Sequence, residues 1–142
     1  MKHLEKPWSG KPLGPRRGTA LVEFSFVALL LFMVLFGMFE IDRMVLVSTA
    51  LADSTRAGVR YAIVHGSDNA VTTDQVKTVI KNYASTGILN TANLNFPTLT
   101  YTPNNQPGSK VDITVTYQYD PFTSYFPLSV TLSSTSQGII TY

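Results

Sequence analysis

An uninterrupted apolar run dominates the hydrophobic pattern of the chain. It extends from Thr19 to Phe39 and contains one ionisable residue, Glu23. At a rise of about 1.5 Å per residue, a helix of this length crosses the roughly 30 Å hydrocarbon core of a bilayer. We therefore predict a membrane-spanning helix over residues 19–39.

After the run, apolar or small residues recur at intervals of three and four, which is typical of one face of a helix. They are Ile41, Met44, Val45, Ser48, Leu51, Ala52, Thr55, Val59, Ala62 and Ile63. Asp53 and Arg56 have the spacing of an ion pair on the exposed side. No proline lies between Thr19 and Gly66, and Gly66 is a natural left-handed cap. The pattern predicts an amphipathic continuation of the same helix over residues 40–66.

A second, shorter helix is predicted after this cap. Thr72 and Gln75 have capping-box spacing, and Val76, Val79, Ile80 and Tyr83 follow at helical intervals before Gly87 ends the element.

The remaining sequence has the alternation of strands. Leu94–Thr102 alternates around Pro97, which marks an edge strand or a bulge. A dense turn signal at 103–108 separates it from the strict alternation of Val111–Tyr119. Residues 122–128 form an aromatic loop that either caps the core or faces a partner. Residues 129–142 are predicted to form one bent strand or two short ones divided near Gln137 and Gly138.

These elements predict an α+β fold. A long amino-terminal helix, membrane-spanning in its first half and amphipathic in its second, precedes a small carboxyl-terminal domain with one short helix and an antiparallel sheet of about three to four strands. The predicted divisions are a basic leader (1–18), the span (19–39), the amphipathic helix (40–66) and the small α+β domain (67–142).

Charge is distributed asymmetrically around the span. Residues 1–18 contain five of the Lys and Arg residues, including Arg16 and Arg17, against one acid, Glu5. Basic residues beside a span stay in the cytoplasm, so the carboxyl-terminal domain is expected in the periplasm or outside the cell. The leader has prolines and glycines without apolar periodicity and is predicted to lack regular structure. Because the rest of the chain is slightly acidic, no nucleic-acid interface is expected.

The sequence offers no constellation of catalytic or metal-binding residues. Residues 65–142 contain one histidine, His65, four aspartates, and neither cysteine nor glutamate. No metal-ligand spacing, nucleophile elbow or phosphate-binding glycine loop is present. We therefore expect no enzyme activity, cofactor, metal or small-molecule substrate.

The junction of leader and span resembles the processing site of type IV pilin-like proteins. The basic pair Arg16 and Arg17 precedes Gly18, and Glu23 and Phe24 follow within the start of the apolar run. The arrangement is most similar to the TadE-like pseudopilins of tight-adherence (Flp) pilus systems. Residues 55–62 also resemble the family pattern after the span, with Thr55 departing from the usual alanine.

The resemblance implies a function in the bacterial inner membrane. A prepilin peptidase would cut between Gly18 and Thr19, and Glu23, as the fifth mature residue, would serve assembly with Phe24. The implied partners are the lipid bilayer, the peptidase, other pilin or pseudopilin subunits and the pilus assembly platform. The implied process is pilus assembly linked to secretion and to cell adhesion.

Other interpretations of the span remain open. One alternative is an uncleaved membrane anchor whose outer domain binds a ligand or partner unrelated to pili. Another alternative is a secreted protein that ordinary signal peptidase releases at Ala50-Leu51-Ala52, although this cut would split the amphipathic helix. The arginine pair also suggests twin-arginine export, but the surrounding consensus is missing.

Overall fold

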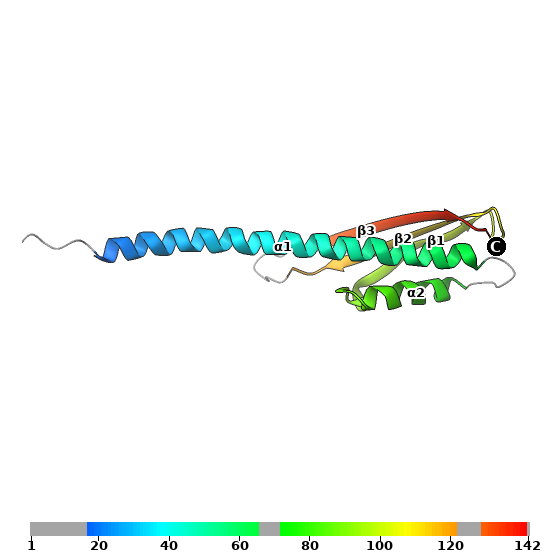
Figure 1. Ribbon diagram of the computed structural model, residues 1–142, viewed down its shortest axis with the longest axis horizontal. Helices are drawn as coiled ribbons and strands as arrows, with labels where there is room; N and C mark the ends of the chain where they lie inside the picture. The colour runs from blue at the N-terminus through cyan, green and yellow to red at the C-terminus, as the bar shows by residue number, and fades with distance from the viewer. Residues whose placement is uncertain (1–16, 66–71, 122–128, 142) are drawn as a thin grey trace, which may run out of the picture. The chain divides into compact units, whose positions relative to one another are not determined.

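The computed structural model describes residues 17–65, 72–121 and 129–141. In chain order these contain helix α1 (Arg17–Val64), helix α2 (Thr73–Ser85), a short 3-10 helix η2 (Thr91–Asn93), and strands β1 (Leu94–Thr102), β2 (Lys110–Tyr119) and β3 (Val130–Ile139) (Figure 1). The predicted α+β fold is confirmed, with a long amino-terminal helix, one short helix and a three-stranded antiparallel sheet.

The chain forms two compact units that meet between Met38 and Phe39, within α1. In the first unit the described residues are all helical. The second unit contains the rest of α1, α2 and the sheet, and the hydrophobic core lies in this unit.

The sheet has one apolar and one polar face because its strands alternate. Its order is β1-β2-β3, with antiparallel neighbours throughout. In β2, Val111, Ile113, Val115, Tyr117 and Tyr119 are buried. The opposite face is polar: the hydroxyls of Thr114 and Thr135 lie 3.0 Å apart across β2 and β3.

Both helices contribute to the core on the apolar face of the sheet. The buried residues are Val47, Leu51, Val59 and Ala62 from α1 and Val76, Ile80 and Ala84 from α2. Two glycines allow this close packing. A Cβ at Gly58 would collide with the Ile80 side chain of α2, and one at Gly138 in β3 would collide with Ile63 of α1.

The capping box and the bulge predicted from the sequence are present in the structure. The capping box at the start of α2 is present, with the Thr72 amide donating to Gln75 Oε1 at 3.0 Å. The register of β1 against β2 shifts between Asn95 and Thr98, which is the bulge predicted at Pro97. In the turn between these strands, Gly108 has a φ of +88°, a conformation that other residues rarely adopt.

Several predicted details are wrong. Arg17 and Gly18 were assigned to an irregular leader but belong to α1, because no proline follows Pro15 to interrupt the first turn. The predicted buried face of α1 included Ile41, Val45 and Ser48, which are exposed.

The face of α1 that is buried also contains residues the pattern omitted, namely Val47, Ser54 and Gly58. Gly58 lies there because Ile80 of α2 approaches it closely, which a search for apolar side chains does not detect. At the end of the chain, β3 is a single strand that continues through Gln137 and Gly138. The predicted cap at Gly66 and the aromatic loop at 122–128 lie outside the described residues.

Candidate functional site

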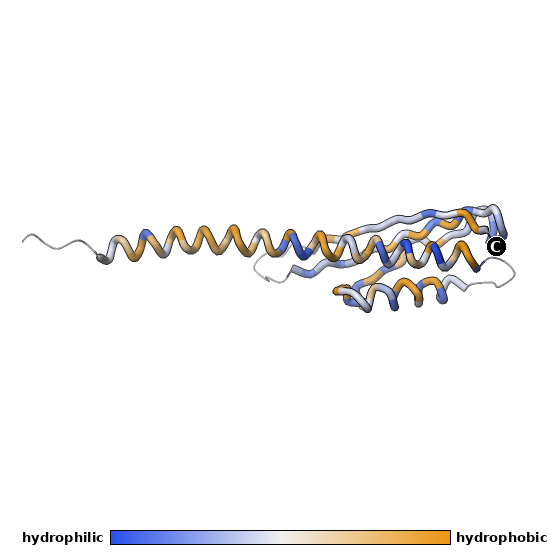
Figure 2. The backbone as a smooth tube through the Cα atoms, in the orientation of Figure 1, coloured by the Kyte–Doolittle hydropathy of each residue, from blue (hydrophilic) through white to orange (hydrophobic). Residues whose placement is uncertain are grey.

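The amino-terminal part of α1 presents an apolar surface on all sides. Large hydrophobic side chains from Leu21 to Phe39 are 40% to 71% exposed, and the most apolar stretch has no buried residue. Figure 2 shows this continuous hydrophobic run, followed by polar positions further along α1. Among the described residues, α1 alone is long and apolar enough to cross a membrane. Its exposure distinguishes it from the core helix of a soluble protein.

Glu23 lies within this apolar surface. Its side chain is exposed, as is that of Phe24 at 70%. No hydrogen bond or ion pair connects Glu23 with another residue in the described part of the chain. The nearby Ser25 hydroxyl, by contrast, donates to the carbonyl of Leu21 at 2.7 Å. Within the described residues, Glu23 is therefore an exposed carboxylate without a counter-charge.

The residues of the predicted processing site begin α1. Gly18 and Thr19 are helical and exposed, and no atom lies within 4 Å of a Cβ placed on Gly18. Arg17 starts the helix, whereas Arg16 lies outside the described residues. Thr19 and Glu23 are separated by one helical turn within the chain. The roles predicted for Arg16, Arg17, Gly18, Thr19, Glu23 and Phe24 remain predictions.

A second polar site lies just beyond the apolar stretch, where β2 meets α1. The hydroxyl of Tyr119, at the end of β2, donates a hydrogen bond of 2.6 Å to Glu40 Oε1. Tyr119 is 1% exposed and Glu40 is half-buried. The Arg43 guanidinium lies 5.5 Å from the centre of the Tyr119 ring. These three side chains, here called the Glu40 cluster, fasten the end of β2 to the helix.

The Glu40 cluster stabilises the neutral form of the tyrosine. Burial raises the pKa of Tyr119 to about 12, and the hydrogen bond and negative charge of Glu40 act in the same direction. The nearby Arg43 cation opposes this change in pKa. Tyr119 therefore remains a hydrogen-bond donor at all physiological pH values.

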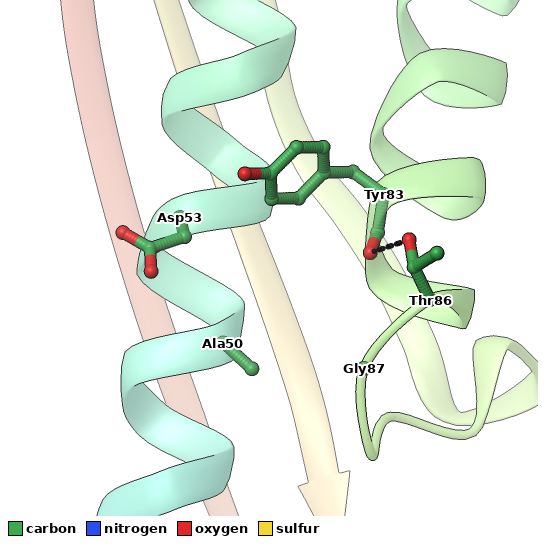
Figure 3. Close-up of a pocket in the computed structure, with 5 residues that line it drawn as sticks. All are labelled: Ala50, Asp53, Tyr83, Thr86 and Gly87. Carbon is green, nitrogen blue, oxygen red and sulfur yellow. Dashed lines mark hydrogen bonds between the residues drawn. The ribbon is translucent and has the colours of Figure 1, made fainter.

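An open hollow lies between α1 and α2 (Figure 3). It is lined by Ala50, Asp53, Tyr83, Thr86 and Gly87. The lining carboxylate is paired, since Arg56 Nη1 lies 3.1 Å from Asp53 Oδ1. The Thr86 hydroxyl donates to the carbonyl of Tyr83 at 2.8 Å, as the dashed line in Figure 3 marks. The Asp53 carboxylate and the Thr86 hydroxyl thus bond to neighbours in their own segments.

The remaining titratable groups lie apart from one another. His65 contacts the carbonyl of Tyr61 through Nδ1 at 2.9 Å and stacks on the Tyr61 ring. His65 directly follows the last residue of α1. In the part of the chain that the structure describes, no three His, Cys, Asp or Glu side chains are grouped so as to hold a metal.

The pattern analysis did not single out the Glu40 cluster. Glu40 and Tyr119 are 79 positions apart, and each has an ordinary local explanation as the polar end of a span or the last residue of a strand. One feature of the sequence could have suggested the contact: Glu40 and Tyr119 each stand at the end of an apolar element. Only the packing of the sheet against α1 makes them neighbours.

Comparison with protein-family models matches residues 18–60 to the family described as TadE-like protein. Neither the curated proteins nor the solved structures give a match. The matched segment contains the apolar surface, Glu23 and the part of α1 that carries Glu40 and Arg43. Residues 18–60 are thus similar to the TadE-like family, and this segment includes the apolar amino-terminal part of α1.

Proposed function

We propose that this chain is a minor pilin or pseudopilin of a tight-adherence (Flp) pilus. It is inserted into the inner membrane through α1, cut by a prepilin peptidase between Gly18 and Thr19, and takes part in pilus assembly and surface attachment. The observation that carries the proposal is Glu23, an exposed carboxylate in an all-round apolar helix whose sequence matches the TadE-like family.

The cut would supply the charge that Glu23 lacks. A carboxylate within the bilayer costs on the order of 3 kcal/mol on insertion scales. Cleavage before Thr19 creates a new ammonium group at the start of the mature chain. In an assembly, the ammonium of one subunit pairs with Glu23 of a neighbour, and this pairing favours a defined axial position of the two helices.

The basic leader supports the orientation in the membrane. Arg16 and Arg17 lie directly before the apolar stretch, so the amino end remains cytoplasmic. The second compact unit, here called the sheet domain, is then exported. In this orientation the Glu40 cluster lies at the outer end of the span. It holds the exported domain to α1 where the helix leaves the lipid.

We also propose a structural, non-catalytic role for the exported domain. Asp53 and Thr86, at the hollow of Figure 3, are bonded to neighbours, and the buried core consists mainly of aliphatic residues. Partners are therefore other pilin subunits and the assembly platform.

The alternative of an uncleaved anchor accounts for the span but leaves Glu23 without a counter-charge. Release after Ala52 is disfavoured by the core, since Leu51 is 1% exposed and Thr55 is fully buried in the same helix. That cut would divide α1 within its packed segment.

Replacement of Glu23 tests the proposal. Glu23→Ala is expected to insert at least as well as the wild type, because it removes a charge from lipid, yet its amount in the sheared pilus fraction should fall by roughly tenfold or more. Quantitative immunoblots of membranes and sheared fibres measure both. Ser25→Ala, on the same exposed helix, is the matched control and should assemble normally. Undiminished assembly of Glu23→Ala would refute the pairing role.

A further inference from the structure

The face of α1 that the sheet domain leaves uncovered carries two separated opposite charges. Asp42 and Arg60 are both exposed, and neither has an ion pair with another described residue. Arg56, on the same side, is already paired with Asp53 at 3.1 Å. Asp42 and Arg60 are therefore the charges on this face that are available to a partner.

The spacing of these two residues places them on one line along the helix. They are 18 positions apart in an unbroken helix, which corresponds to about five turns and about 27 Å. Exposed apolar residues follow each charge by one turn: Leu46 is 60% exposed and Val64 is 58% exposed. The same 18-position interval thus separates an acid from a base and one aliphatic side chain from another.

We propose that this face binds a second copy of the chain, parallel to the first and displaced along the helix axis by about 27 Å. In this arrangement Asp42 of one copy faces Arg60 of the next, and Leu46 faces Val64. The inference rests on the proposed function, and it adds a specific contact outside the membrane to the one at Glu23. Each copy in a stacked assembly has several neighbours. The contact at Glu23 and the contact between Asp42 and Arg60 therefore involve different neighbours, at different axial displacements.

The displacement determines the kind of assembly. An antiparallel pair would also match the two charges, but copies inserted with the same end in the cytoplasm are parallel. A parallel contact between different parts of the same surface is heterologous, and its repetition with an axial rise gives an open filament and not a closed ring. Two copies at the same depth in one bilayer cannot make the contact, so it forms as one copy leaves the membrane.

Cysteine cross-linking tests this register, since the chain contains no cysteine. The full-length chain with Leu46→Cys and Val64→Cys is expressed in cells that assemble the pilus and is treated with a short bis-maleimide. We expect a ladder of dimers, trimers and larger species, because position 46 of one copy meets position 64 of the next. Each single variant serves as a control and should remain monomeric.

Charge reversal tests the ionic part of the contact. In the doubly substituted chain, Arg60→Glu should reduce the ladder by roughly two- to fivefold at low ionic strength, because two acids then face each other. Lys81→Glu, an exposed charge reversal on α2, should leave the ladder unchanged. Equal ladders from both variants would overturn the charge register.

The pilus fraction separates failure of the register from failure of the proposed function. If the doubly substituted chain is present in sheared fibres but gives no ladder, or if Leu46→Cys alone gives equal dimers, the 27 Å register is wrong and assembly stands. If the wild-type chain is absent from fibres and from every multimer trapped by an amine cross-linker, the proposed function fails and the register fails with it.

Discussion

At the scale of single residues, the hydrogen bond between Tyr119 and Glu40 connects the sheet to α1. The donor is almost fully buried and the distance is 2.6 Å. Such a bond to a charged acceptor contributes more to stability than one between neutral groups. Because the pair lies where the apolar stretch ends, its loss would loosen the end of β2 nearest to that stretch.

Tyr119→Phe should therefore destabilise the sheet domain by about 1 to 3 kcal/mol near neutral pH, since Glu40 loses a charge-assisted bond. Urea unfolding of the detergent-solubilised chain, followed by circular dichroism, measures the change. An unchanged unfolding midpoint and slope would show that the bond contributes nothing.

The same variant should change the response to alkaline pH. The pKa of Tyr119 is raised to about 12 in the folded chain, above the value of about 10 for an unfolded tyrosine. Its contribution is therefore fully present below pH 10 and is lost as the pH rises toward 12, because the unfolded chain releases the proton first. Wild-type stability should fall by about 2 to 3 kcal/mol over this range.

In Tyr119→Phe the folding stability should fall less at alkaline pH than in the wild type. Tyr101 contributes to the remaining fall, because burial also raises its pKa. Equal losses in wild type and variant between pH 9 and pH 12 would contradict the assignment.

The sequence could not give this pair, since the contact depends on how β2 lies on α1. An alternating strand that ends in tyrosine predicts burial but not its acceptor.

At the scale of elements, the positions of helices and strands followed from local patterns. The capping box at Thr72, the alternation of β2 and the bulge near Pro97 each depend on residues close in sequence. The buried face of α1 did not follow in the same way. Gly58 is buried because Ile80 of α2 packs there, and its small size becomes informative only when the partner is known.

Gly58→Ala tests this packing. A methyl group there would lie 2.6 Å from Ile80 Cδ1, and Ile80 is itself fully buried. We expect a net loss of about 1 to 3 kcal/mol in unfolding free energy, despite the better helix propensity of alanine. Gly37→Ala is the matched control, because no atom lies within 4 Å of that position and the core should be unaffected. A stabilised Gly58→Ala variant would show that α2 does not pack tightly on α1.

At the scale of the whole molecule, the apolar surface of α1 and the folded core of the sheet domain differ in how their apolar side chains are removed from water. The apolar core residues of the sheet domain are buried against one another, whereas the exposed apolar surface of α1 needs lipid or other helices. The sequence predicted this division because the uninterrupted run and the alternating strands are both local features. The counter-charge proposed for Glu23 was not predictable by pattern alone, since the described residues of one chain show no partner for it.

The first residue of the mature protein tests the central claim most directly. Amino-terminal sequencing and intact mass of the chain purified from the membrane and fibres of its own cells determine it. Processing by a prepilin peptidase predicts Thr19 as the first residue, which also supplies the ammonium proposed to pair with Glu23. Met1 would instead support an uncleaved anchor and Asp53 a secreted form, and either result would contradict the account.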